Sequence, residues 1–329
     1  MDDFADPRAD PRAALPSSCE RAAFFDIAHE GAQLRAIAEA ADVFAPLRSL
    51  APRSLVIVPA DQSSAAAARA AVELAAPAAL PVMVTPGLPH YVGALDVVVV
   101  VGEPSSPEAA EAASRALATA ARRGAASVLA GPAGGAVVSE APSDTIVIPA
   151  PPGPEGPSAL RSFGAAWALV RPEDARGGLL GAAADEVDRE LVGLSPERDA
   201  TVNPARALRE FAAAGPLVHT GVNSCGRVVA RAVAEMWSVR GMASGFVDRD
   251  ELGRALRETG PEDIFHDPFI DPPAGAVGPA VVAWNQDDRR HLPAGRARAE
   301  GVAEGETGAF GAAARLLVRA LAATVMENA

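Results

Sequence analysis

The sequence contains no lysine, so all 29 residues in its lysine-plus-arginine count are arginines. A Schiff-base enzyme needs an amine that can lose its proton, and arginine keeps its proton in proteins. A Walker-type phosphate loop also requires a lysine. The missing residue type therefore excludes aldolases of the Schiff-base type, pyridoxal-phosphate enzymes and P-loop NTPases.

Cysteine, positive charge and long apolar runs are scarce too. Two cysteines are too few for a disulfide framework or a cysteine-based metal site, and no His, Cys and carboxylate grouping has metal-ligand spacing, so we expect no metal and no cofactor. A net charge of −13 opposes binding to nucleic acids and to anionic membranes. Nowhere do eighteen uncharged apolar residues run together, as a membrane span would require, and the acidic start lacks the features of a secretory signal. We expect a cytoplasmic protein with no nucleic-acid or membrane partner.

Short apolar runs alternate with alanine-rich helical stretches along most of the chain. The five consecutive valines at 97–101 are typical of a parallel strand that is buried on both faces. We predict further strands at 55–58, 81–85, 127–130, 145–148, 217–220, 242–247 and 281–284. Helices are predicted at 19–45, 63–76, 107–123, 158–170, 172–192, 204–214, 226–238, 248–258 and 308–326. This alternation predicts an α/β fold of two Rossmann-like domains, each a parallel sheet flanked by helices.

Proline-rich segments suggest the domain boundaries. Residues 1–17 repeat the pattern Asp-Pro-Arg-Ala and are predicted to form a disordered arm. The first layered domain is expected at 18–150, and the proline-rich stretch 149–157 begins a linker with helices at 151–204. The second layered domain is expected at 205–329.

Hydroxyl groups occur in three turns where a predicted strand meets a helix, which is the side of an open parallel sheet where ligands bind. The first turn carries Ser63 and Ser64, the second Ser105 and Ser106, and the third Ser224. Hydroxyls and free amides at helix N-termini suit an anion, although the same residue types are also common as simple helix caps. A Gly-x-Gly-x-x-Gly dinucleotide motif is absent from these turns, which disfavours NAD.

Two further residues are candidates for proton transfer. Glu235 lies on the helix predicted at 226–238, where a solvated helix carboxylate is the alternative. His266 is followed by Asp267 in a loop that mixes acids and aromatics, and a neighbouring carboxylate can orient a histidine for acid–base work. A locally hydrogen-bonded turn histidine is the alternative there.

The order of these parts resembles the bifunctional phosphoglucose/phosphomannose isomerase family of the SIS (sugar isomerase) superfamily, in its divergent TobH-type branch. The resemblance rests on the segments 92–96, 102–123 and 122–125, on Ala230 with the adjacent Arg231, and on the loop 264–269. It implies two SIS domains, a homodimer with sites at its interface, and a phosphosugar ligand. It also implies Glu235 and His266 as catalytic residues, with Ser63, Ser64, Ser105, Ser106, Ser224 and Arg231 binding substrate.

The sequence also departs from that family's pattern. Glu103 and Asp61 place negative charge in the turns where the phosphate is expected, and the family's glutamate falls on Ser238, one turn beyond Glu235. We therefore expect a SIS-domain protein that binds a phosphorylated sugar with lost or weakened isomerase activity. The alternative is an active glucose-6-phosphate/mannose-6-phosphate aldose–ketose isomerase.

Overall fold

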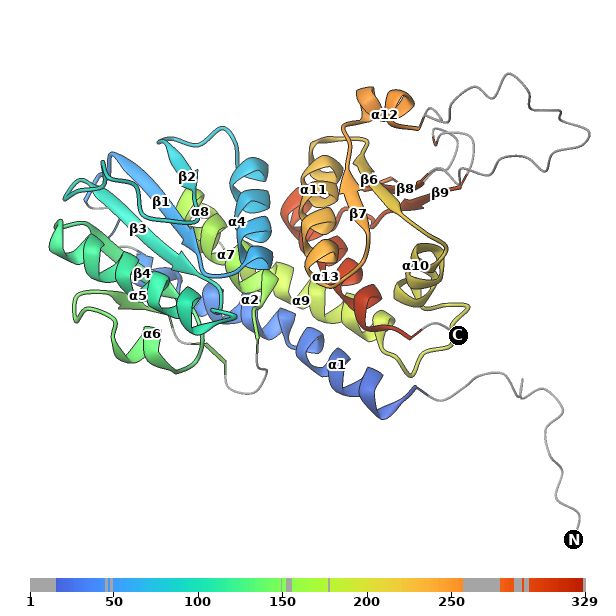
Figure 1. The fold of residues 1–329 in the computed structure, drawn as a ribbon, viewed down its shortest axis with the longest axis horizontal. Coiled ribbons are helices and arrows are strands. Elements are labelled where there is room, and N and C mark those ends of the chain that lie inside the picture. The colour runs from blue at the N-terminus through green and yellow to red at the C-terminus, as the bar shows by residue number, and fades with distance from the viewer. Residues whose placement is uncertain are drawn as a thin grey trace, which may run out of the picture.

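The computed structural model describes residues 16–44, 47, 50–148, 150–151, 156–176, 178–256, 279–286, 292 and 296–327. The molecule has two parallel sheets, one in each half (Figure 1). The first sheet has five strands in the order β2-β1-β3-β4-β5, and the second has four in the order β7-β6-β8-β9. The described strand pairs are all parallel. The predicted α/β fold with two helix-flanked parallel sheets is confirmed.

The first half begins with α1 (Ser18–Ala28), α2 (Glu30–Glu39) and the 3-10 turn η1 (Ala41–Phe44). Its sheet and crossover helices are β1 (Ser54–Pro59), α4 (Gln62–Leu74), β2 (Val82–Val84), β3 (Asp96–Val101), α5 (Pro107–Arg122), β4 (Ala126–Ala130), α6 (Ala136–Ser139) and β5 (Ile146–Val147). Four helices follow, namely α7 (Ala159–Val170), α8 (Pro172–Arg176), α9 (Leu179–Leu194) and α10 (Pro204–Ala213). The second sheet and its helices are β6 (Leu217–Gly221), α11 (Ser224–Val239), β7 (Ser244–Phe246), α12 (Arg249–Ala255), β8 (Ala280–Trp284), β9 (Ala297–Glu300) and α13 (Gly308–Val325).

The five-valine strand is buried on both faces, as predicted. Val97, Val99 and Val101 face the main core, whereas Val98 and Val100 face a second cluster beneath α5. None of these valines is more than 1% exposed. Helices therefore cover both faces of the first sheet, which is the arrangement that a parallel sheet requires.

The main core continues from the first sheet into the second. Helix α4 packs against α7 on one side and against α11 on the other, and α11 in turn packs against α13 (Figure 1). The buried residues of these helices belong to the same cluster as the inner faces of both sheets. Whether the halves divide at the predicted domain boundaries stays a prediction.

Helix α13 is long and apolar enough by composition to cross a membrane, and 67% of that stretch is buried inside the protein. Phe310, Leu317 and Leu321 are almost fully buried there. Packing within the core explains the apolar composition of this helix.

Several predicted boundaries are wrong. The helix predicted at 19–45 is broken at His29 and ends in the turn η1, and Ser17 caps its first part by accepting from the Glu20 amide. The predicted helix 172–192 divides into α8 and α9, with Gly178 in the left-handed conformation at φ 83° before α9. The helix predicted at 248–258 is shorter, because α12 covers only Arg249–Ala255. The arm predicted at 1–17 falls almost entirely outside the described residues.

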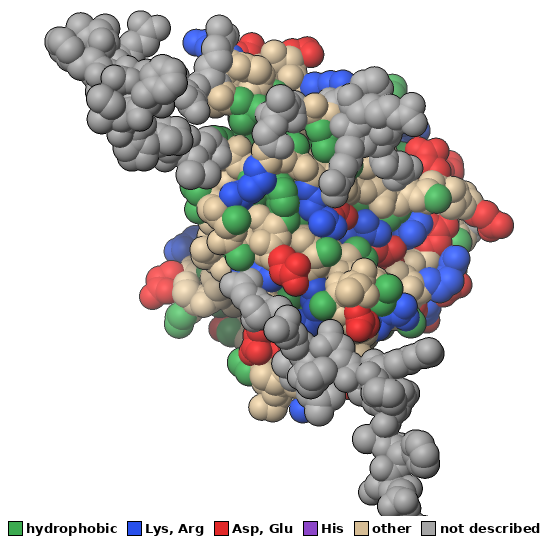
Figure 2. Space-filling view, turned by 90° about the vertical axis from the view of Figure 1, so that its right-hand side faces the viewer, with side chains coloured by type: hydrophobic (Ala, Val, Ile, Leu, Met, Phe, Trp, Pro, Cys, Tyr) green, Lys and Arg blue, Asp and Glu red, His purple; other side chains and the backbone are tan. Residues whose placement is uncertain are grey.

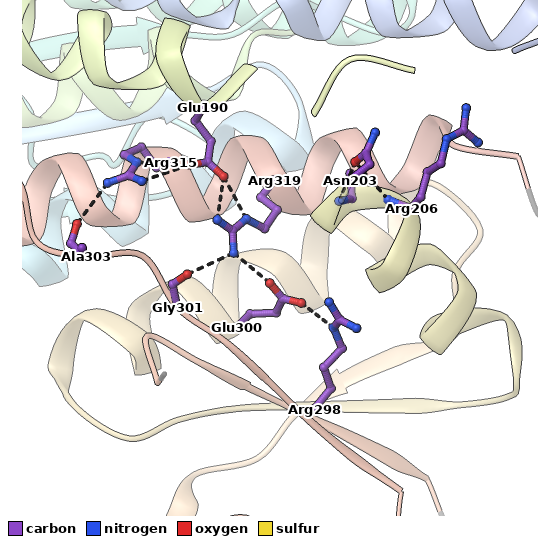
Figure 3. A network of polar contacts seen from close by, with 10 residues as sticks. Glu190, Asn203, Arg206, Arg298, Glu300, Gly301, Ala303, Arg315 and Arg319 are labelled. Carbon is purple, nitrogen blue, oxygen red and sulfur yellow. Dashed lines mark hydrogen bonds and ion pairs between the residues drawn. The ribbon is translucent and has the colours of Figure 1, made fainter. Parts of the chain in front are cut away.

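A chain of ion pairs joins α9, α13 and β9 (Figure 3). Arg319 donates to Glu190 Oε1 at 2.7 and 2.9 Å and to Glu300 Oε2 at 2.9 Å. Arg315 shares Glu190, and Arg298 shares Glu300. Figure 2 shows the side of the molecule that carries the second half, where arginine and carboxylate side chains lie next to one another across a band. The surface there is mixed in charge despite the net charge of −13.

Candidate functional site

A cleft lies where the strand order of the first sheet reverses, between β1 and β3. Helix α4 leaves β1 toward the main core, and α5 leaves β3 toward the opposite face. In open parallel sheets this crevice is where ligands bind. The cleft has a volume of about 510 Å³ and is lined by the end of β1, by α4 and α5, and by Glu235 of α11. That volume falls within the range of roughly 300–1,000 Å³ of small-molecule sites.

The charged centre of the cleft is an ion pair between the two halves. Arg69 of α4 donates a hydrogen bond to Glu235 of α11. The Arg69 side chain is 42% exposed and that of Glu235 is 30% exposed, so a ligand has access to both. With the Asp61 carboxylate, also in the lining, two carboxylates face one guanidinium, which gives a formal charge of −1.

The pair belongs to a ladder of charges along two antiparallel helices. One turn beyond Arg69, Glu73 of α4 pairs with Arg231 at 2.9 Å and with Arg227 at 3.5 Å. Arg231 also stacks over the ring of Phe246 at 4.7 Å. Because α11 runs opposite to α4, its later residues lie nearest the cleft. Arg231 is therefore engaged in the helix–helix contact, one turn away from Glu235.

The turn after β1 already contains an anion of its own. Asp61 caps α4, and its Oδ1 accepts from the Ser64 amide at 2.8 Å. Its Oδ2 accepts from the Glu103 amide at 3.1 Å, so one carboxylate joins the turns after β1 and β3. A Cβ at Gly102, whose φ is +93°, would lie 2.3 Å from Asp61 Oδ2 and from Ser64 Oγ. This position therefore requires glycine.

The predicted serines lie in different surroundings. Ser63 and Ser64 are buried in the first turn of α4, and Ser64 Oγ has no hydrogen-bond partner among the residues that the structure describes. Ser106 caps α5 by accepting from the Ala109 amide at 3.2 Å, while Ser105 is exposed beside it. Asp61 therefore caps α4, and Ser106 caps α5. The role of the four predicted serines of this half in phosphate binding stays a prediction.

Ser224 is the first residue of α11 and is exposed, and Asn223 caps the helix by accepting from the Gly226 amide at 2.8 Å. The start of α11 lies beside Glu73, near the end of α4, because Arg227 pairs there. Ser63 is ten residues earlier on α4, a rise of about 15 Å. The structure therefore does not bring Ser224 together with the serines of the first sheet.

Of the two predicted catalytic residues, Glu235 lies in the cleft, and His266 falls outside the described residues. The described part of the chain contains no group of three His, Cys, Asp or Glu residues arranged to hold a metal ion. Sequence reasoning missed Arg69. Arg69 is the one arginine of the alanine-rich helix α4, and its partner Glu235 is 166 positions away in the sequence. Only the folded structure therefore reveals the pair.

A fully buried histidine lies on the central strand of the second sheet. His219 Nδ1 accepts from Trp284 Nε1 at 3.0 Å, and its ring stands edge-on to Trp237 at a centroid distance of 4.9 Å. Burial lowers the pKa of His219 to about 3. The ring is therefore neutral near pH 7, and because Nδ1 accepts, Nε2 must carry the proton. It is a core residue rather than a member of the cleft.

Comparisons with known proteins support the fold at low sequence identity. No protein-family model and no curated protein matches the chain. Among solved structures, the tagatose-6-phosphate ketose/aldose isomerase of Escherichia coli superposes with a TM-score of 0.61 at 13% identity, covering 95% of each chain. The C-terminal domain of the glucosamine-fructose-6-phosphate aminotransferase of Francisella tularensis gives a TM-score of 0.60 at 11% identity, covering 92% of this chain and 94% of that one.

A candidate phosphosugar isomerase from Silicibacter pomeroyi matches with a TM-score of 0.57 at 17% identity, over 94% of this chain and 96% of its own. Together these matches support the predicted SIS-type fold, with a helix-flanked parallel sheet in each half. At such identity the likeness extends to the fold alone, because one fold can support different functions.

Proposed function

We propose that the protein binds a phosphorylated sugar in the cleft between α4, α5 and α11. The observation that carries this proposal is the Arg69–Glu235 pair in a cleft at the strand-order reversal of the first sheet. The names of the structural neighbours support the choice of ligand, since they refer to phosphosugars such as tagatose 6-phosphate. The cleft is also large enough for a ligand of this size.

Arg69 is the group that would hold the phosphate. Among the described residues that line the cleft it is the one basic side chain. A guanidinium presents parallel N–H donors that match phosphate oxygens, and such charge-assisted bonds are stronger than neutral ones. An incoming phosphate must then compete with Glu235 for Arg69.

The same geometry argues for weak isomerase activity or none. The N-terminus of α4 is not free to bind phosphate, because Asp61 already accepts hydrogen bonds from the amides of Ser64 and Glu103. A phosphate charge about 4 Å from that carboxylate would cost on the order of 4 kcal/mol at an effective dielectric near 20. Glu235, the proposed proton carrier, is bound to Arg69 in the absence of ligand. We infer a binding protein with lost or weakened catalysis, of the phosphoglucose/phosphomannose isomerase type, TobH-like branch.

An active glucose-6-phosphate/mannose-6-phosphate isomerase is the second candidate, and one observation favours it. A phosphate that takes Arg69 would release Glu235 beside the sugar, where a carboxylate could move a proton between neighbouring carbons. His266 would then open the ring, and a partner subunit of a homodimer would be its source, as the family resemblance implies.

Thermal unfolding with glucose 6-phosphate, mannose 6-phosphate and fructose 6-phosphate tests binding, and a coupled assay for fructose 6-phosphate tests turnover. We expect a saturable rise in Tm without turnover. The rise should be lost in Arg69→Met and kept in Arg115→Met, whose side chain is 62% exposed on α5. No shift with any of the three at millimolar concentration would contradict the proposal, and steady product formation would favour the second candidate.

A further inference from the structure

A second cavity, of about 420 Å³, lies between α9 and the turn that precedes α13, away from the phosphosugar cleft. Its wall includes Asp185, Glu186, Glu190 and Glu306, with Arg189 and Arg315 as its cations. Figure 3 labels two residues of this wall, Arg315 and Glu190, which form an ion pair. Four carboxylates against two guanidinium groups leave an excess of negative charge.

Glu186 is the unusual member of this wall. It is only 6% exposed, and its buried Oε2 has no hydrogen-bond partner in the part of the chain that the structure describes. Among the described residues, no arginine lies within 4 Å of its carboxylate. A buried carboxylate that has neither a cation nor a hydrogen bond costs several kcal/mol, so the fold leaves this group in need of positive charge.

The neighbouring carboxylates are already neutralised or exposed. Asp185 pairs with Arg35 at 2.7 Å, and Glu190 is shared by Arg315 and Arg319. A second buried group without a partner lies beside Glu186. Thr307 is 5% exposed, and its Oγ1 makes no hydrogen bond to any residue in the described ranges. A Cβ at Gly311 would lie 1.7 Å from Thr307 Oγ1 and 2.7 Å from Glu186 Oε2, so both oxygens abut Gly311.

The kind of cation follows from what the cavity offers. A divalent metal ion prefers six or more oxygen ligands, and the described residues contain no group of three His, Cys, Asp or Glu side chains that could hold one. A guanidinium binds best to both oxygens of a carboxylate, but Oε2 of Glu186 is buried. An ammonium is a compact charge that one oxygen can satisfy. The methyl group of Ala182 in the same wall suits an attached alkyl chain.

We propose that this cavity binds an alkylammonium group, held by Glu186 with Glu306 nearby. The ammonium belongs either to a free amine or to a lysine side chain of another protein, since this chain has no lysine of its own. The net charge of −13 also draws such cations to the surface.

The test measures Tm against the concentration of putrescine and of Nα-acetyl-lysine amide, with sodium chloride at equal ionic strength as the reference. At tenfold above Kd we expect a Tm rise of about 2–4 °C. Glu186→Gln should abolish the rise, whereas Glu197→Gln, exposed on a loop, should keep it. A response to putrescine alone assigns a free amine, and a response to the lysine derivative assigns a side chain.

A further variant guards against a folding effect of Glu186→Gln. Ala182 is exposed on α9, so Ala182→Leu should fold normally while it fills the cavity, and it too should abolish the rise. Three results would overturn the proposal: no rise with either compound at 20 mM, an undiminished rise in Glu186→Gln, or a rise produced by magnesium in place of the amines.

Discussion

The buried histidine of the second sheet predicts how the protein responds to acid. Burial lowers the pKa of His219 to about 3 in the folded state, whereas an exposed histidine in the unfolded chain titrates near 6.5. Between these two values the unfolded state binds more protons than the folded state. The free energy of unfolding must therefore fall as the pH drops below 6.5, and this contribution is fully present only above that pH.

The expected size of the effect follows from the two pKa values. Each pH unit below 6.5 costs about 1.4 kcal/mol until the pH approaches 3. At pH 5.5 the loss relative to high pH is about 1.4 kcal/mol, and at pH 5.0 it is about 2 kcal/mol. These losses hardly depend on the folded pKa so long as it stays below about 4, because the folded ring then remains neutral at both pH values.

Urea unfolding followed by tryptophan fluorescence measures this effect, because Trp237 and Trp284 both contact the ring. The comparison uses wild type, His219→Gln and the control His90→Gln, whose histidine is exposed. His219→Gln changes the absolute stability, so the informative quantity is the loss between pH 7.5 and pH 5.5. We expect that loss to be about 1.4 kcal/mol smaller in His219→Gln than in the other two proteins. Equal losses in all three would refute the reasoning.

Two further predictions concern stability. Arg319→Met removes a cation shared by the buried carboxylates of Glu190 and Glu300, and it should lower the free energy of unfolding in urea by about 3–5 kcal/mol. Arg115→Met, which breaks an exposed pair, should lower it by less than about 1 kcal/mol. Similar losses in the two variants would count against a buried network. Gly226→Ala places a Cβ 2.1 Å from the Trp284 carbonyl oxygen, and it should lower the free energy of unfolding by about 1–3 kcal/mol. Gly253→Ala lies on α12, where a Cβ would have nothing within 4 Å, and it should not destabilise the protein. An unchanged Tm for Gly226→Ala would contradict the close packing of α11 on β8.

The strands that were predicted correctly from the sequence are those formed by continuous apolar runs. The valines of β3 allow little but a doubly buried strand, and β1, β4, β6 and β8 have similar runs. Strand β9 was not predicted, because its sequence Ala297-Arg298-Ala299-Glu300 has little β propensity. Its pairing with β8 and the ion pair of Glu300 with Arg319 of α13 hold it in place. These are tertiary effects that a local pattern does not contain.

The candidate site was predicted only in part, for a related reason. Glu235 could be selected from its place on the first helix after β6, but its contact with Arg69 depends on how α4 and α11 pack. Turn residues such as Asp61 suggest either a ligand or a cap, and only the hydrogen bonds to Ser64 and Glu103 decide for the cap. The charges across the cleft therefore become visible only once the two halves are assembled.

Calorimetric titration of glucose 6-phosphate into wild type, Arg69→Met and Glu235→Gln tests the proposed cleft most directly. If the phosphate competes with Glu235 for Arg69, the Glu235→Gln variant should bind glucose 6-phosphate about 5–10-fold more tightly than wild type. The substitution breaks a partly exposed ion pair worth up to about 1 kcal/mol, which frees the Arg69 guanidinium, and it also removes a negative charge from the cleft. Arg69→Met should show no measurable binding. Unchanged affinity in both variants would place any phosphosugar elsewhere and would contradict the account.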